Sequence, residues 1–98
     1  MSVNILVVCV NQDILKVIVR LINANENWAA VGKSNIPDAI DALLANHFEL
    51  LLIGSGFTES EEQGMADYVQ NTIPDLRIAK HYGGGSGLLS AEIYQALS

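Results

Sequence analysis

Hydrophobic and polar positions fall in blocks along the chain, and these blocks predict strands and helices in alternation. Residues 5–10 form a continuous apolar run rich in β-branched residues, without period-two alternation. Such a run is typical of a strand buried on both faces of a parallel sheet. A polar break follows, in which Asn11 or Asp13 suits the cap of a helix. Residues 14–22 then carry apolar side chains near helical spacing, which predicts an amphipathic helix.

The next blocks repeat this order. Residues 28–31 predict a second strand, and their lower hydrophobicity favours a sheet edge. Pro37 suits the first turn of a second helix, where its missing N–H costs nothing. The buried side of that helix is expected to carry Ile36, Ala39, Ile40, Leu43 and Leu44. Residues 50–53 predict a second strongly buried strand.

The last third of the chain adds a third helix, a fourth strand and a final helix. Ser60 and Gln63 have the spacing of a capping box at the start of the third helix, and Pro74 ends it. Residues 76–82 are polar enough for an edge strand. The glycine-rich segment 83–87 leads into a helix with apolar residues at Leu88, Leu89, Ile93 and Leu97.

This βαβαβαβα order predicts an α/β fold, with helices on both faces of an open parallel sheet in three layers. The 98 residues suit a single domain over positions 1–98. Sequential strands joined by helices should connect through right-handed crossovers.

Charge and cysteine content narrow the expected partners and location. Five basic residues, scattered along the chain, face eleven acidic ones, for a net charge of −6. This balance argues against direct binding to nucleic acid or to an anionic membrane surface. No apolar run approaches the ~20 residues of a membrane span, and the first residues lack signal-peptide features. The only cysteine, Cys9, lies in an apolar run, which suits a reducing compartment and a cytoplasmic protein.

Several short segments together resemble one known family. They are Ile5-Leu6-Val7-Val8 before a polar break and a helix, His47-Phe48-Glu49 leading into Leu50–Ile53, Gly64-Met65, and Ile73-Pro74-Asp75-Leu76-Arg77-Ile78. In order and spacing, over about residues 2–82, they resemble the receiver domain of response regulators. The resemblance implies a flavodoxin-like sheet in strand order 2-1-3-4, four βα units, and a missing fifth strand.

The chain departs from the receiver pattern at each functional position. The aspartate that receivers phosphorylate, at the end of the third strand, corresponds to Gly54, which offers no nucleophile. The two acidic Mg²⁺ ligands correspond to Cys9 and Val10, and a hard cation needs oxygen ligands. The switching hydroxyl corresponds at best to Tyr82, and the unit bearing the fifth-strand lysine is absent. We therefore expect no phosphorylation, no metal and no cofactor.

Three loops should meet at the carboxyl ends of the strands, where open α/β sheets bind ligands. The glycine segment followed by a helix start suits a phosphate group. It matches neither GxGxxG nor GxxxxGK[ST] and has no following lysine, so a flexible turn replacing the missing unit is the simpler interpretation. The candidate ligand-binding residues are Asn11, Asp13, Gly54, Ser55, Gly83, Gly84, Gly85 and Ser86.

No residues suggest catalysis, because Ser55 and Ser86 lack a pairing base and orienting group. The leading hypothesis is a non-phosphorylatable receiver-like signalling module that acts through protein–protein contact, with a second copy in a homodimer as one such partner. The alternative is a sensor that binds a phosphate-bearing or other anionic ligand at the segment Gly83–Gly87. A small enzyme ranks last.

Overall fold

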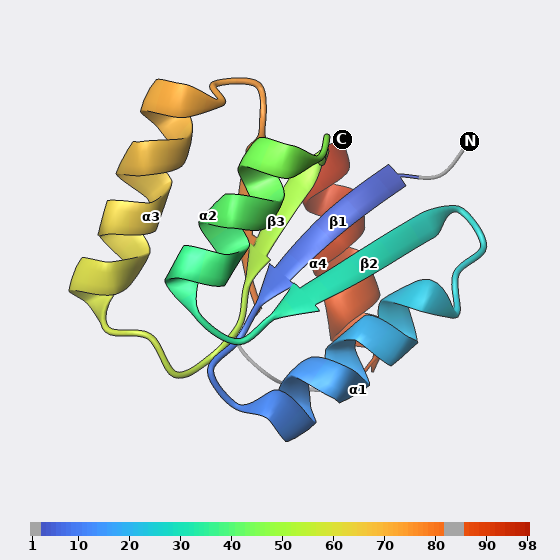
Figure 1. Cartoon of the computed structure of the whole chain (residues 1–98). Helices are drawn as coiled ribbons and strands as arrows, with labels where there is room; N and C mark the ends of the chain where they lie inside the picture. The colour runs from blue at the N-terminus through green and yellow to red at the C-terminus, as the bar shows by residue number, and fades with distance from the viewer. Residues whose placement is uncertain (1–2, 82–85) are drawn as a thin grey trace.

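Four parallel strands form the sheet, in the order β2-β1-β3-β4 (Figure 1). The computed structural model describes residues 3–81 and 86–98. Its elements follow one another as β1 (Val3–Val8), α1 (Gln12–Asn23), β2 (Trp28–Lys33), α2 (Ile36–Ala45), β3 (Leu50–Ile53), α3 (Glu59–Thr72), β4 (Arg77–Lys80) and α4 (Ser86–Leu97). The predicted α/β class and strand order are confirmed, and the two less apolar strands lie at the edges.

The helices cover the sheet on both faces, which gives three layers (Figure 1). The side chains of β1 alternate between the two cores, yet Ile5, Leu6, Val7 and Val8 are all fully buried. One core joins the sheet to α1 and α4, and the other joins it to α2 and α3. Burial on both faces explains the continuous apolar runs of β1 and β3.

The ring of Trp28, at the start of β2, packs against Tyr94 of α4. The ring centroids are 4.8 Å apart and the planes are inclined by 56°, a tilted arrangement that aromatic pairs favour. This contact holds α4 on the same face of the sheet as α1. The chain passes from β4 to α4 without a further strand among the described residues.

Two helix starts differ in how well the sequence predicted them. Asn11, rather than Asp13, caps α1, because its Oδ1 accepts a hydrogen bond from the N–H of Ile14 at 3.1 Å. The capping box predicted at Ser60 and Gln63 is wrong. Thr58 caps α3 with Glu61, and their reciprocal hydrogen bonds measure 3.1 and 2.9 Å. The sequence Thr58-Glu59-Ser60-Glu61 contains the same motif two residues earlier.

The predicted apolar faces are also only partly buried. In α1, Leu15, Ile18 and Ile22 are buried, whereas Ile14 and Val17 are each 43% exposed. A helix that packs on one face of a sheet buries only a narrow stripe of its surface. Residues 14–22 contain more apolar side chains than fit in that stripe. In α2, Leu44 is likewise exposed. The first strand ends at Val8, so Cys9 and Val10 lie in the following loop.

Among the described residues, no helix combines the length and hydrophobicity needed to cross a lipid bilayer.

Candidate functional site

A cavity of about 720 Å³ opens at the carboxyl edge of the sheet. It brings together Asp13, Gly54 and Ser55 from the residues predicted to bind a ligand. Most of its other described lining is apolar and comes from α1, β3, the loop after β3 and α4: Ile14, Val17, Ile18, Leu21, Ile53, Phe57 and Leu89. A cavity of this size and chemistry suits the body of a small organic molecule.

At this edge, the structure leaves no room for a side chain at position 54. The N–H of Gly54 donates a 2.7 Å hydrogen bond to the carbonyl of Val8, which ties the end of β3 to β1. A Cβ atom built on Gly54 would lie 2.9 Å from Cβ and 3.0 Å from Sγ of Cys9. Real Cβ atoms do not approach other carbons so closely. Cys9 therefore fills the space that a side chain would need at position 54, which the sequence resemblance matched to the receiver phosphoacceptor.

Gly56 shows the same relationship with Val10. Its φ of 103° lies in the left-handed region that favours glycine. A Cβ atom there would lie 2.7 Å from Cβ of Val10. Cys9 and Val10, which were expected at the positions of the receiver metal ligands, thus pack against two glycines of the loop after β3. Each pair holds one small residue and one larger apolar residue.

The Cys9 thiol is fully buried, and backbone carbonyl oxygens lie within hydrogen-bond distance of it. Its Sγ lies 3.6 Å from the carbonyl oxygen of Asn11 and 3.7 Å from that of Ser55. A buried thiol in apolar surroundings behaves as a small hydrophobic residue. Cys9 therefore joins the loop after β1 to the loop after β3 instead of presenting a reactive group.

The remaining predicted ligand residues lie elsewhere or outside the described parts of the chain. Asn11 uses its side chain to cap α1 and does not line the cavity. The segment Gly83–Gly85 lies outside the described residues. Ser86 is the first residue of α4, and its side chain lies outside the description.

Two polar pairs at the cavity were not predicted from the sequence. Nδ1 of His81 lies 2.5 Å from Oε1 of Glu92, and these side chains are only 8% and 16% exposed. Nζ of Lys80 lies 2.9 Å from Oε1 of Glu62. Both basic side chains of the described lining therefore have a carboxylate partner. In the described segments, no three His, Cys, Asp or Glu side chains are grouped to hold a metal ion.

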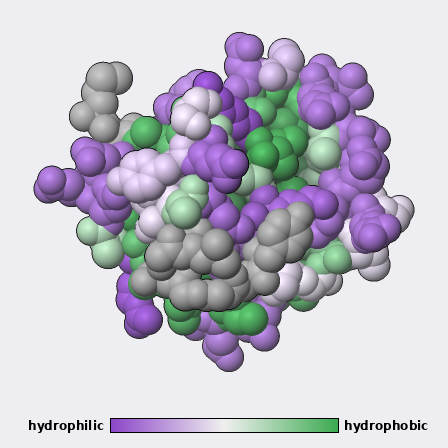
Figure 2. All heavy atoms as spheres, turned by 180° about the vertical axis from the view of Figure 1, so that it is seen from behind, coloured by the Kyte–Doolittle hydropathy of each residue, from purple (hydrophilic) through white to green (hydrophobic). Residues whose placement is uncertain are grey.

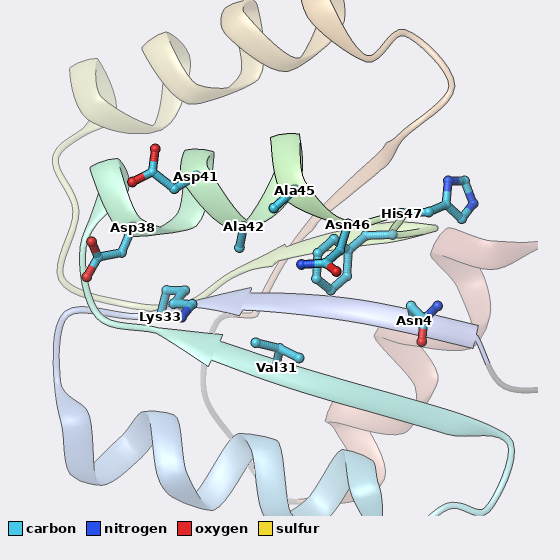
Figure 3. Close-up of a pocket in the computed structure, with 10 residues that line it drawn as sticks. Asn4, Val31, Lys33, Asp38, Asp41, Ala42, Ala45, Asn46 and His47 are labelled. Atoms are coloured by element: carbon cyan, nitrogen blue, oxygen red, sulfur yellow. The ribbon is translucent and has the colours of Figure 1, made fainter.

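A second, shallower groove of about 680 Å³ lies between α2 and the edge strand β2 (Figure 3). Lys33, Asp38 and Asp41 lie toward one end, and Asn4 and His47 toward the other (Figure 3). Val31, Ala42 and Phe48 also line it. The imidazole of His47 is 82% exposed and its Nε2 lies 3.5 Å from Oε1 of Glu49. The mixed charges make this groove an ordinary solvated surface.

Comparison with known proteins finds similarity in structure alone, since no protein-family model and no curated protein sequence matches the chain. HP1043, an orphan response regulator of H. pylori, superposes with a TM-score of 0.84 at 10% identity, over 99% of this chain and 98% of that one. A sensor protein from Polaromonas gives 0.83 at 8% identity, over 99% and 97%. The receiver domain of the stress response regulator RcsB from Escherichia coli gives 0.71 at 13% identity, over 98% and 76%.

At these identities the similarity establishes the fold alone, and the chemistry has to be argued from this chain's own residues. The strand order, the helix on each connection and the position of the carboxyl-edge loops all agree with it. The chain has the CheY-like fold of response-regulator receiver domains, with a sheet of four strands.

Proposed function

We propose that this chain is a non-phosphorylatable receiver-like signalling module that acts in the cytoplasm through contact with proteins, and that it is not an enzyme. The observation that carries the proposal is the contact between Cys9 and Gly54. Phosphoryl transfer to a receiver needs a carboxylate nucleophile and oxygen ligands for a cation. Positions 54, 9 and 10 supply neither, and the space for the nucleophile is occupied.

The carboxylates at this edge do not replace the missing groups. Asp13 is exposed in the first turn of α1, and Glu62 is paired with Lys80. Glu92 is engaged by His81. A lone exposed carboxylate is a poor site for Mg²⁺, which prefers several oxygen ligands.

The test is incubation with acetyl phosphate and Mg²⁺, followed by intact mass spectrometry. We expect the mass to stay unchanged, while a receiver with its aspartate intact, treated in parallel, gains a phosphoryl group of about 80 Da. A stable addition of that mass to this chain, removed by hydroxylamine, would show an acyl phosphate and refute the proposal.

The second candidate function is a small-ligand sensor at the carboxyl-edge cavity. The apolar lining favours a ligand with an apolar body, and the pairing of Lys80 with Glu62 gives a free anion little attraction there. Thermal shift against phosphometabolites, nucleotides and uncharged aromatic compounds separates these classes. A ligand at a hundred times its Kd adds roughly 2.7 kcal/mol of stability. Absence of any shift across the collection removes this function.

A further inference from the structure

The fold gathers three of the five basic residues into one groove, although they are scattered along the sequence. This basic groove, of about 550 Å³, lies between α1 and the edge strand β2, which run side by side (Figure 1). Lys16 and Arg20 line it from α1, and Lys33 lines it from the end of β2. In a chain with a net charge of −6, the basic groove is a local concentration of positive charge.

The three cations of the basic groove have no acidic partner. None of them forms an ion pair with a carboxylate among the described residues. The other two basic residues are engaged, because Lys80 pairs with Glu62 and Arg77 donates to a backbone carbonyl of α4. Lys16 and Arg20 are four positions apart, so their charges are neighbours on the helix surface and repel each other. An anion bound between them removes this repulsion.

Acidic side chains do not neutralise the basic groove. Asp13, in the first turn of α1, lines the carboxyl-edge cavity and does not line the basic groove. The one carboxylate among the described lining is that of Asp38, in the first turn of α2, across from Lys33 (Figure 3). Its Oδ2 accepts a 3.0 Å hydrogen bond from Nδ2 of Asn35. The lining therefore keeps an excess of positive charge.

The backbone of Gly32 adds a donor to the basic groove. The carbonyl of Lys33 accepts a hydrogen bond from Cys9 and so points toward β1. Alternate residues of a strand point their backbone groups to opposite sides, so the N–H of Gly32 points outward, into the groove that Gly32 lines. A Cβ atom at Gly32 would lie 2.9 Å from side-chain atoms of both Leu15 and Val19. Glycine thus lets α1 lie close to β2 and leaves this N–H uncovered by a side chain.

The charge of the basic groove selects the class of its occupant. Seen from behind, a recessed apolar area lies between hydrophilic side chains on the side of the molecule that carries α3 (Figure 2), but apolar surface alone does not say what covers it. Three cations and an outward N–H select an anion that can accept several hydrogen bonds. A phosphate group does so with three terminal oxygens, and a guanidinium binds it through two parallel hydrogen bonds.

The surroundings favour a small molecule over an acidic segment of another protein. The volume of the basic groove lies in the range of small-molecule sites. Along β2, Asn23 already binds both backbone groups of Ala30, at 2.8 and 3.4 Å, so an extended segment cannot continue along this edge. The net charge of −6 repels a long acidic chain, whereas a small anion senses mainly the charges within about 10 Å.

We propose that the basic groove binds a small phosphate-bearing molecule. Lys16 and Arg20 hold the phosphate oxygens from α1, and Lys33 adds its charge from the end of β2. Gln12 and Ser34 line the same groove, and their side chains form no hydrogen bond within the described residues, so they supply neutral donors. This site goes beyond the proposed function, and its failure would leave the outcome of the acetyl phosphate experiment unaffected.

The test is an amide NMR titration with sodium pyrophosphate, with the ionic strength held constant by sodium chloride. We expect saturable shifts at Gly32 and around Lys16 and Arg20, with a Kd of about 1 mM or tighter. Arg20→Gln should weaken binding about tenfold, as loss of a charge-assisted bidentate contact implies. Arg77→Gln is the matched control, because it removes the same charge from β4, outside the basic groove, and should bind like the unchanged chain.

Absence of saturable shifts up to about 10 mM overturns the proposal. Equal weakening in Arg20→Gln and Arg77→Gln would show a general effect of net charge and overturns it as well. Hexaglutamate is the second probe: if it binds in the basic groove and pyrophosphate does not, the occupant is an acidic protein segment and the small-molecule site is refuted. If Arg20→Gln does not fold, Lys16→Gln takes its place, with the same expected loss and the same control.

Discussion

Cys9 occupies the space that a side chain at position 54 would need. The built Cβ of Gly54 lies 2.9 Å from Cβ of Cys9 and 3.3 Å from the carbonyl oxygen of Val8, and both positions are fully enclosed. Protein interiors are close-packed, so neither neighbour has room to retreat. A larger side chain at position 54 therefore requires a change at Cys9 as well, and under the proposed function a single substitution at position 54 would not restore a phosphorylation site.

Gly54→Ala is expected to destabilise the fold because its methyl group collides with Cys9. Overpacking a filled core costs typically 1–3 kcal/mol, and we expect about that loss in the free energy of unfolding. Urea denaturation measures it. Gly64→Ala is the matched control, since no atom lies within 4 Å of a Cβ there and Gly64 lies within α3. It should gain about 0.5–1 kcal/mol, the usual advantage of alanine over glycine in a helix.

A double variant tests whether Cys9 is the residue that the new methyl group at position 54 contacts. The double variant Cys9→Gly with Gly54→Ala removes the atoms that the new methyl group meets. Neighbouring substitutions that share a contact couple by about 0.5–3 kcal/mol, so the double variant should lose less stability than the sum of the single variants. Strict additivity would show that Cys9 does not fill this position.

The fold could be predicted from the sequence because its signals are local and repeated. The buried runs at β1 and β3 and the amphipathic helices between them indicate a parallel sheet without knowledge of any contact. The edge positions of β2 and β4 follow from their lower hydrophobicity. Helix faces were less predictable, because Ile14 and Leu15 are equally apolar and only the angle at which α1 lies on the sheet decides which is buried.

Thr58→Ala should destabilise α3, because Thr58 accepts from the N–H of Glu61 and holds its carboxylate at the helix start. Loss of an N-cap costs about 1 kcal/mol. Ser60→Ala, at the position that the sequence pattern equally suggested as the cap, should change stability by less than about 0.5 kcal/mol, as exposed substitutions do. Thermal unfolding of both variants measures the difference. A larger loss for Ser60→Ala would mean that α3 begins later.

Asn23→Ala should destabilise the protein by about 1–2 kcal/mol, because it leaves both backbone groups of Ala30 without their amide partner. Asn71→Ala is the control, since Asn71 is an exposed asparagine near the end of α3 whose side chain makes no hydrogen bond within the described residues. Hydrogen exchange adds a specific measurement: the amide of Ala30 should lose protection in Asn23→Ala and keep it in Asn71→Ala. Unchanged protection would contradict the role given to Asn23.

The site was less predictable than the fold because its contacts join distant segments. The loops carrying Asp13, Gly54 and Ser55 were expected to meet, since carboxyl ends of parallel strands share one edge. The pair His81 and Glu92 had no such signal. Its formation depends on how α4 lies against β4, and eleven residues of sequence separation fix neither the rotation nor the offset of that helix.

The His81–Glu92 hydrogen bond gives the last prediction. Glu92→Ala removes a carboxylate partner from an imidazole that is almost entirely buried, and hydrogen bonds to charged groups contribute about 1.5–3 kcal/mol. Glu92→Gln should lose less, because its amide oxygen still accepts from an Nδ1–H. Gln95→Ala, one turn along α4 and exposed, controls for the change of helix residue. Nitrogen NMR of the imidazole should show Nδ1 carrying the proton in the unchanged chain, and equal losses in Glu92→Ala and Gln95→Ala would show that the bond contributes nothing.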